Sequence, residues 1–117
     1  MGDRVTVYQK PTCTKCRQTL ARLNECNVEF EAVNYYETPL TEEALGELIN
    51  KLGIAPRELL RKDEAIYREL ELGRREVADD DLIRLMVEHP DLMQRPIVVR
   101  GDRAVLARPV EILDSLL

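Results

Sequence analysis

Two cysteines near the start of the chain, Cys13 and Cys16, stand three residues apart in the order Cys-Thr-Lys-Cys. The thiolate is the nucleophilic form of cysteine, and nearby positive charge lowers the pKa of a thiol. Three basic residues surround the pair, although the chain has a net charge of −5: Lys10, Lys15 and Arg17. No acidic residue stands between Arg4 and Glu25. The pattern predicts a reactive cysteine at position 13.

The remaining potential metal ligands do not extend this pair into a metal site. A zinc site needs four ligands, and Cys26 and His89 would have to complete it without a second paired motif. At the far end of a helix, Cys26 would lie about 15–20 Å from Cys13, because a helix rises by about 1.5 Å per residue. In a chain that we expect not to be secreted, the C-x-x-C spacing favours redox chemistry. We expect no metal and no bound cofactor.

The elements around the pair place Cys13 at the start of a helix. Alternating β-branched and aromatic residues predict a strand over about 4–8, and apolar spacing that includes Leu20 and Leu23 predicts a helix from 14 to about 26. The first N–H groups of a helix are unpaired and carry partial positive charge. A thiol at this turn therefore ionises more easily.

A second strand and several helices follow. Residues 28–35 alternate apolar and polar side chains, as a half-exposed strand does. A helix between two strands makes a β-α-β unit, so these strands should be parallel. Four further helical segments are expected at 41–53, 56–60, 65–70 and 79–89. Together they make a helical insertion at about residues 41–90.

The last part of the chain predicts a hairpin and a helix. Apolar runs at 97–100 and 103–106 flank Gly101-Asp102, a two-residue turn. A final helix should begin at Pro109, with these residues as its apolar face: Ile112, Leu113 and Leu116. The order β-α-β, helical insertion, β-β-α, with C-x-x-C after the first strand, predicts an α/β thioredoxin-like fold. We expect residues 1–117 to form one such domain around a mixed four-stranded sheet.

Composition excludes several classes of function. The chain has 117 residues, enough for one core, and contains no run of apolar residues long enough to span a membrane. The first four residues lead directly into a strand, which leaves no room for a signal peptide, so we expect a cytoplasmic protein. Net negative charge and few aromatic residues argue against direct nucleic-acid binding.

Three arginines stand at junctions between expected elements: Arg61, Arg95 and Arg108. Guanidinium groups are permanently charged and offer paired, planar donors that match tetrahedral oxyanions. A cysteine at a helix start and positive charge on loops facing it would together make an oxyanion site. Each arginine alone is more often an ordinary surface residue, and only their combination favours an oxyanion site.

The arrangement of these residues resembles the glutaredoxin-linked arsenate reductase family over about residues 5–116. The matching segments are Cys13, Tyr36-Glu37-Thr38-Pro39, Leu60-Arg61-Lys62, Glu88-His89-Pro90, Arg95-Pro96-Ile97-Val98-Val99 and Arg108-Pro109. The resemblance implies that the Cys13 thiolate attacks arsenate while Arg61, Arg95 and Arg108 bind this small oxyanion. It also implies glutathione with glutaredoxin, or thioredoxin, as the electron donor, and a cis Arg95-Pro96 peptide.

Two positions depart from that family. Gln9 stands where its members commonly carry a histidine, so activation of Cys13 would depend on the helix terminus and nearby cations. Cys16 is outside the arsenate reductase pattern and resembles Spx, a redox-sensing regulator that binds RNA polymerase. Cys16 could resolve an adduct on Cys13, or it could be a small buried residue.

Three functions therefore remain open. The first is thiol-dependent reduction of arsenate to arsenite. The second is an Spx-like regulator of RNA polymerase, switched by a Cys13–Cys16 disulfide. The third is a general dithiol oxidoreductase that does not need the arginines. Spx, as that family is known, lacks the third arginine, whereas Arg108-Pro109 is present here, which favours the reductase.

Overall fold

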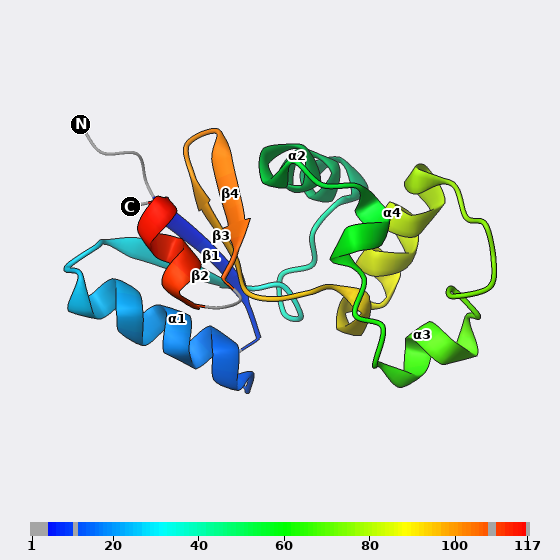
Figure 1. The fold of residues 1–117 in the computed structure, drawn as a ribbon, viewed down its shortest axis with the longest axis horizontal. Helices are drawn as coiled ribbons and strands as arrows, with labels where there is room; N and C mark the ends of the chain where they lie inside the picture. Colours follow the sequence, from blue (N-terminus) through cyan, green and yellow to red (C-terminus); the bar gives the residue numbers. More distant parts are fainter. Residues whose placement is uncertain (1–4, 11, 108–109, 117) are drawn as a thin grey trace. The chain divides into compact units, whose positions relative to one another are not determined.

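The computed structural model describes residues 5–10, 12–107 and 110–116 (Figure 1). The chain divides into two compact units, one made of residues 1–38 and 95–117, the other of residues 39–94. Within the described residues, every helix is too short or too polar to cross a membrane.

The first unit is built on a four-stranded mixed sheet, as predicted. Its strands are β1 (Val5–Gln9), β2 (Phe30–Asn34), β3 (Ile97–Arg100) and β4 (Arg103–Leu106), in the order β2-β1-β3-β4. Strand β2 runs parallel to β1, while β3 is antiparallel to both β1 and β4. The β-α-β unit and the hairpin are therefore confirmed, although β2 is shorter than the expected 28–35.

Helix α1 (Thr14–Glu25) joins β1 to β2 and ends where Asn27 adopts a left-handed conformation with φ 56°. The short 3₁₀ helix η3 (Val110–Ser115) contacts α1 and β4. A buried apolar cluster joins these elements: Val5, Val7, Leu23, Val98, Ala107, Leu113 and Leu116. This cluster fixes α1, and hence the turn that carries Cys13, against the sheet.

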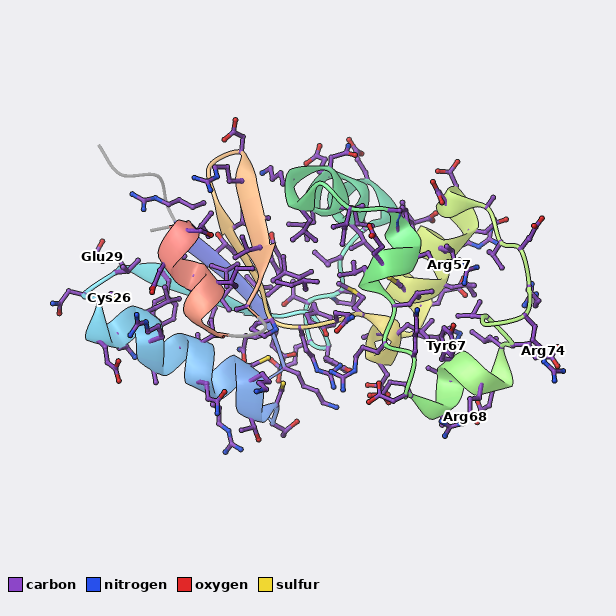
Figure 2. The ribbon with its side chains drawn as sticks, in the orientation of Figure 1. Cys26, Glu29, Arg57, Tyr67, Arg68 and Arg74 are labelled. Carbon is purple, nitrogen blue, oxygen red and sulfur yellow. The ribbon has the colours of Figure 1, made fainter. Side chains whose placement is uncertain are left out.

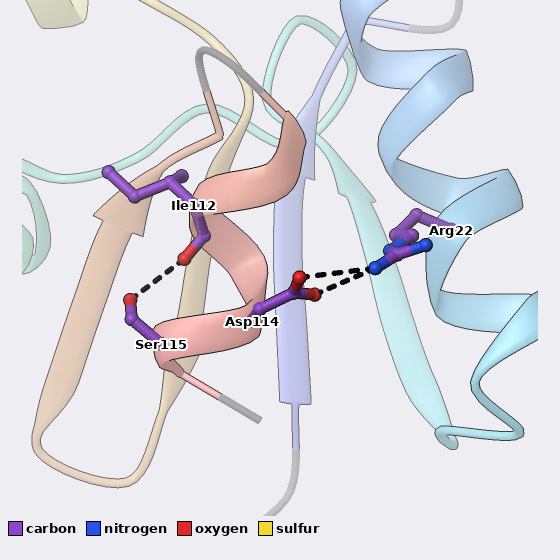
Figure 3. Close-up of polar contacts among 4 residues, drawn as sticks. All are labelled: Arg22, Ile112, Asp114 and Ser115. Carbon is purple, nitrogen blue, oxygen red and sulfur yellow. Dashed lines mark hydrogen bonds and ion pairs between the residues drawn. The ribbon is translucent and has the colours of Figure 1, made fainter.

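The side chains of η3 include one that forms an ion pair with α1 and one whose predicted position was wrong. Arg22 Nη2 lies 3.0 Å from Asp114 Oδ1 and 3.2 Å from Oδ2, which ties α1 to η3 (Figure 3). The prediction that Ile112 belongs to the apolar face is wrong, because its side chain is 40% exposed. With three residues per turn in a 3₁₀ helix, Leu113 and Leu116 share a face and Ile112 lies beside it.

The second unit is helical. It contains α2 (Glu42–Leu52), η1 (Pro56–Leu59), α3 (Ala65–Glu69), α4 (Asp79–Glu88) and η2 (Pro90–Leu92). The expected helix at 56–60 is thus a 3₁₀ helix. The Thr41 side chain accepts a hydrogen bond from the Ala44 N–H at 3.0 Å, and Gly53 with φ 70° ends α2. Buried side chains of α2 and α4 form its core: Leu45, Leu48, Ile49, Leu82 and Met86.

Candidate active site

Cys13 occupies the N-cap position of α1. Its backbone is extended, with φ −82° and ψ 125°, and its N–H donates to the Lys10 carbonyl at 2.9 Å. The Cys13 carbonyl accepts the Arg17 N–H at 3.1 Å, and the first turn of α1 contains no acidic residue. The sulfur therefore lies at the positive end of the helix dipole, with no carboxylate in that turn to oppose ionisation.

The pKa of the Cys13 thiol is lowered to about 7. Burial acts to raise it, but hydrogen bonds outweigh burial: from the backbone N–H and thiol of Cys16, from the Arg95 side chain, and from the backbone N–H of Lys15. A pKa near neutrality means that a substantial fraction of this thiol is the thiolate at pH 7. The expectation of a reactive cysteine thus has a structural basis.

Cys16 has the opposite character. Its side chain is fully buried and its pKa is raised to about 11, first by burial and then by the hydrogen bond and charge of Cys13. The Lys10 N–H and the Arg95 charge act to lower the pKa of Cys16, but they do not outweigh these causes. Both cysteines are free thiols in the structure. The pair therefore combines an ionised nucleophile with a protonated thiol one turn further into α1.

Arg95 lies at the same end of the sheet as Cys13. Strand β3 is antiparallel to β1, with Tyr8 opposite Ile97, so the residues after β1 and before β3 meet at one edge. The Arg95–Pro96 peptide is cis, as the resemblance implied. Arg95 is 6% exposed and hydrogen-bonds Cys13. Burial acts to lower its pKa, but three neighbours outweigh it and raise the pKa: Tyr35, Tyr36 and Cys13.

The other two arginines are placed differently. Arg61 belongs to the unit of residues 39–94, where its N–H donates to the Leu92 carbonyl at 2.7 Å. Its Nε lies 3.2 Å from Glu64 Oε1, close enough for an ion pair but without hydrogen-bond geometry. Its Nη1 is buried and has no hydrogen-bond partner among the described residues. Arg108 lies outside the described residues.

Gln9 and Cys26 are the two other residues that the sequence connects with Cys13. Gln9 is 6% exposed at the end of β1, opposite Asn34 of β2, and its Oε1 has no hydrogen-bond partner among the described residues. Cys26 follows α1 at its other end and is exposed (Figure 2). It is therefore separated from Cys13 by the whole length of the helix, as expected.

Sequence reasoning missed the role of Tyr35 and Tyr36, which follow β2 directly. Because β2 is parallel to β1, with Asn34 opposite Gln9, the residues after both strands reach the same edge of the sheet. Arg95 Nη1 donates to Tyr36 Oη at 3.4 Å. The parallel pairing was predictable, so the position of these tyrosines could have been found from it.

Comparison with known proteins gives one consistent picture. The sequence model of the ArsC family matches residues 8–115. The uncharacterized protein YfgD of Escherichia coli K12 is 43% identical over 112 residues, covering 95% of this chain and 94% of YfgD. The arsenate reductase of the same organism is 40% identical over 115 residues, covering 98% of this chain and 82% of that enzyme. The structure of an arsenate reductase from Vibrio cholerae superposes with a TM-score of 0.94 at 37% identity, covering 100% of both chains.

Proposed function

Because this chain belongs to the ArsC family, we propose that it is an enzyme that reduces arsenate to arsenite through a covalent adduct on Cys13. One observation carries the proposal: a thiol with a pKa of about 7 at a helix N-terminus hydrogen-bonds a buried arginine, Arg95. The thiolate supplies the nucleophile, and the guanidinium supplies paired donors for an oxyanion.

The first step forms the adduct. The Cys13 thiolate attacks arsenic and displaces one oxygen ligand, which takes up a proton and leaves as water. A sulfur–arsenic bond forms, and arsenic remains As(V). In this proposal Arg95, Arg61 and Arg108 bind the remaining oxygens.

The second step transfers the electrons. The Cys16 thiolate attacks the Cys13 sulfur, the sulfur–arsenic bond breaks, and its electron pair remains with arsenic. Arsenic is thereby reduced to As(III) and leaves as arsenite, while the two thiols are oxidised to a disulfide. Glutathione with glutaredoxin, or thioredoxin, then reduces the disulfide.

The order of these steps follows from the pKa values of the two thiols. Burial is the largest cause of the raised pKa of Cys16, but the charge of Cys13 and its hydrogen bond also raise it. Once Cys13 is bound to arsenic, its negative charge is gone and that part of the barrier to ionisation of Cys16 disappears. Cys16 thus becomes easier to ionise only after Cys13 has reacted.

The test is steady-state arsenate reduction, followed as NADPH oxidation with glutathione, glutaredoxin and glutathione reductase, or with thioredoxin and its reductase. Cys13→Ser should abolish turnover, and Arg95→Ala should reduce kcat/KM for arsenate by at least tenfold. Cys26→Ser is the matched control, because this exposed cysteine follows the far end of α1. An unmodified chain that reduces no arsenate with either donor system would reject the proposal.

A second candidate is a regulator that binds RNA polymerase through a Cys13–Cys16 disulfide switch. The hydrogen bond between the two cysteines favours it, because it places the sulfurs side by side. The test is a pull-down with purified RNA polymerase by the reduced and the oxidised chain, with Cys16→Ser as control. Absence of binding in both states would dismiss this candidate.

A further inference from the structure

One aromatic residue contacts both segments that meet at the proposed nucleophile. Tyr36 follows β2, and its ring packs on that of Tyr35 with centroids 5.1 Å apart. Lys10, in the loop between β1 and α1, places its Nζ 4.8 Å from the centre of the Tyr36 ring. Arg95, before β3, donates from Nη1 to Tyr36 Oη at 3.4 Å. The ring face and the phenol oxygen thus hold two different cations.

The cation–π contact between Lys10 and Tyr36 affects both cysteines, because the Lys10 backbone hydrogen-bonds each of them. The Lys10 carbonyl accepts the Cys13 N–H at 2.9 Å, and the Lys10 N–H is directed at the Cys16 sulfur. A lysine ammonium group over an aromatic face is held by the negative potential of that face. Anchoring the Lys10 side chain on the ring therefore restrains the backbone that hydrogen-bonds Cys13.

The contact with Arg95 bears on the thiolate itself. The Arg95 guanidinium is one of the groups that hydrogen-bond Cys13 and lower its pKa, and the residue is only 6% exposed. An arginine has five N–H donors in a fixed planar fork, so an acceptor on one side of the fork orients the other side. The Tyr36 oxygen is such an acceptor.

We propose that Tyr36 is a positioning residue that aligns Arg95 through its phenol oxygen and the Lys10 loop through its ring, thereby setting the geometry around Cys13. The inference rests on the proposed function, because it takes Cys13 as the nucleophile. In this proposal Tyr36 acts through Arg95 and Lys10 and not on the sulfur directly. The alternative is that Tyr36 only packs against Tyr35, in which case phenylalanine would replace it without effect on Cys13.

The first arm of the test separates the phenol oxygen from the ring. Tyr36→Phe keeps the ring but removes one acceptor of Arg95 and leaves its interaction with Tyr35 in place, so the Cys13 thiolate should lose part of its stabilisation. The pKa of Cys13, measured from the pH dependence of its iodoacetamide alkylation with the modified site identified by mass spectrometry, should rise by about half a unit. Tyr8→Phe, a half-buried tyrosine of β1, is the matched control and should leave this pKa unchanged. An unchanged or lower Cys13 pKa in Tyr36→Phe overturns the proposal.

The second arm tests the ring. Tyr36→Leu and Lys10→Met each remove the cation–π contact, so the Cys13 amide, which donates to the Lys10 carbonyl, should exchange with deuterium about two- to fivefold faster. Tyr36→Phe should leave this exchange rate unchanged. The double variant should exchange no faster than either single variant, because both remove one contact. Additive effects, or normal exchange in Tyr36→Leu, would contradict the role of the ring.

Neither readout requires arsenate, so the two proposals can fail separately. If the chain reduces no arsenate but Tyr36→Phe raises the Cys13 pKa, the proposed function is wrong and the role of Tyr36 stands. If arsenate is reduced, the KM for arsenate should also rise in Tyr36→Phe, about threefold, because Arg95 is less well oriented for the oxyanion. If the chain is active but the Cys13 pKa and the arsenate KM are unchanged in Tyr36→Phe, the phenol oxygen of Tyr36 has no part in the site.

Discussion

The Cys13 thiol hydrogen-bonds the Cys16 thiol one helical turn away, yet the pKa of Cys13 is lowered to about 7 and that of Cys16 is raised to about 11. The difference arises from position. Cys13 is at the helix N-terminus and receives several hydrogen bonds, whereas Cys16 is fully buried. A dithiol with this asymmetry has a defined direction of reaction, because only one of its two sulfurs is nucleophilic at neutral pH.

Replacing Cys16 tests this asymmetry. Cys16→Ala removes the thiol that donates to Cys13, so the pKa of Cys13 should rise, and it also removes the thiol proposed to release arsenite. Alkylation of Cys13 as a function of pH measures the first effect, in a Cys26→Ser background that leaves one reactive thiol. Turnover with thioredoxin and its reductase as the only electron donor should fall at least tenfold in the variant. A Cys13 pKa that stays near 7 would show that the Cys16 thiol contributes no hydrogen bond, since the Cys16 backbone N–H remains in this variant.

The pH dependence of the reaction should follow the thiolate of Cys13. Because the pKa of Cys13 is lowered to about 7, the thiolate fraction rises as pH increases through 7 and levels off above about pH 8. The value of kcat/KM for arsenate should therefore increase with pH on the acid side, with an apparent pKa near 7. In Arg95→Ala this increase in kcat/KM should occur at higher pH, since Arg95 is one of the groups that lower the pKa of Cys13. If the increase occurs at the same pH in this variant as in the unmodified chain, the hydrogen bond between Arg95 and Cys13 is contradicted.

The contributions of two neighbouring residues of η3, Leu113 and Ile112, to the free energy of unfolding should differ. Leu113 is fully buried in the apolar cluster of the first unit, whereas Ile112 is 40% exposed. Leu113→Ala should lower the free energy of unfolding by about 2–5 kcal/mol, through lost burial and the cavity left behind. Ile112→Ala should lower it by less than about 1 kcal/mol, as expected for an exposed site. Urea unfolding measures both, and similar losses would contradict the described packing of η3.

In the second unit, Arg57 restrains the loop that follows α3. Its Nη1 donates to the Leu72 carbonyl at 2.8 Å and its Nη2 to the Arg75 carbonyl at 3.2 Å. Arg57→Met should therefore accelerate trypsin cleavage after Arg74 or Arg75, because both are exposed in this loop. Figure 2 shows Arg57 and Arg74. Arg68→Met, an exposed residue of α3, is the control and should leave the cleavage rate there unchanged.

The elements around Cys13 could be predicted because local signals define them. The strand before it, the helix after it and the Gly101-Asp102 hairpin each follow from spacing within a few residues. The 3₁₀ helices could not be distinguished from α-helices, because periods of 3.0 and 3.6 hardly differ over one or two turns. For the same reason Ile112 was assigned to the wrong face.

The surroundings of the nucleophile depend on pairing between distant strands, which the sequence indicates less directly. Lys10, Tyr36 and Arg95 meet because β1 lies between β2 and β3 in the sheet. The sequence identified Arg95 and Lys10 by their charge. Tyr36 was noted only as part of a segment that resembles the family, and no role was predicted for it, since an aromatic residue after a strand is most often part of the core.

The order of the strands also bears on how the protein is made. Residues 39–94 form one continuous unit, whereas the first unit combines both ends of the chain, and Tyr8 pairs with Ile97. On the ribosome, Cys13 emerges long before Arg95 and β3 exist to complete its surroundings. Until Arg95 and β3 have been synthesised, this thiol lacks one of the groups that lower its pKa, so its surroundings are completed long after the thiol itself has been made.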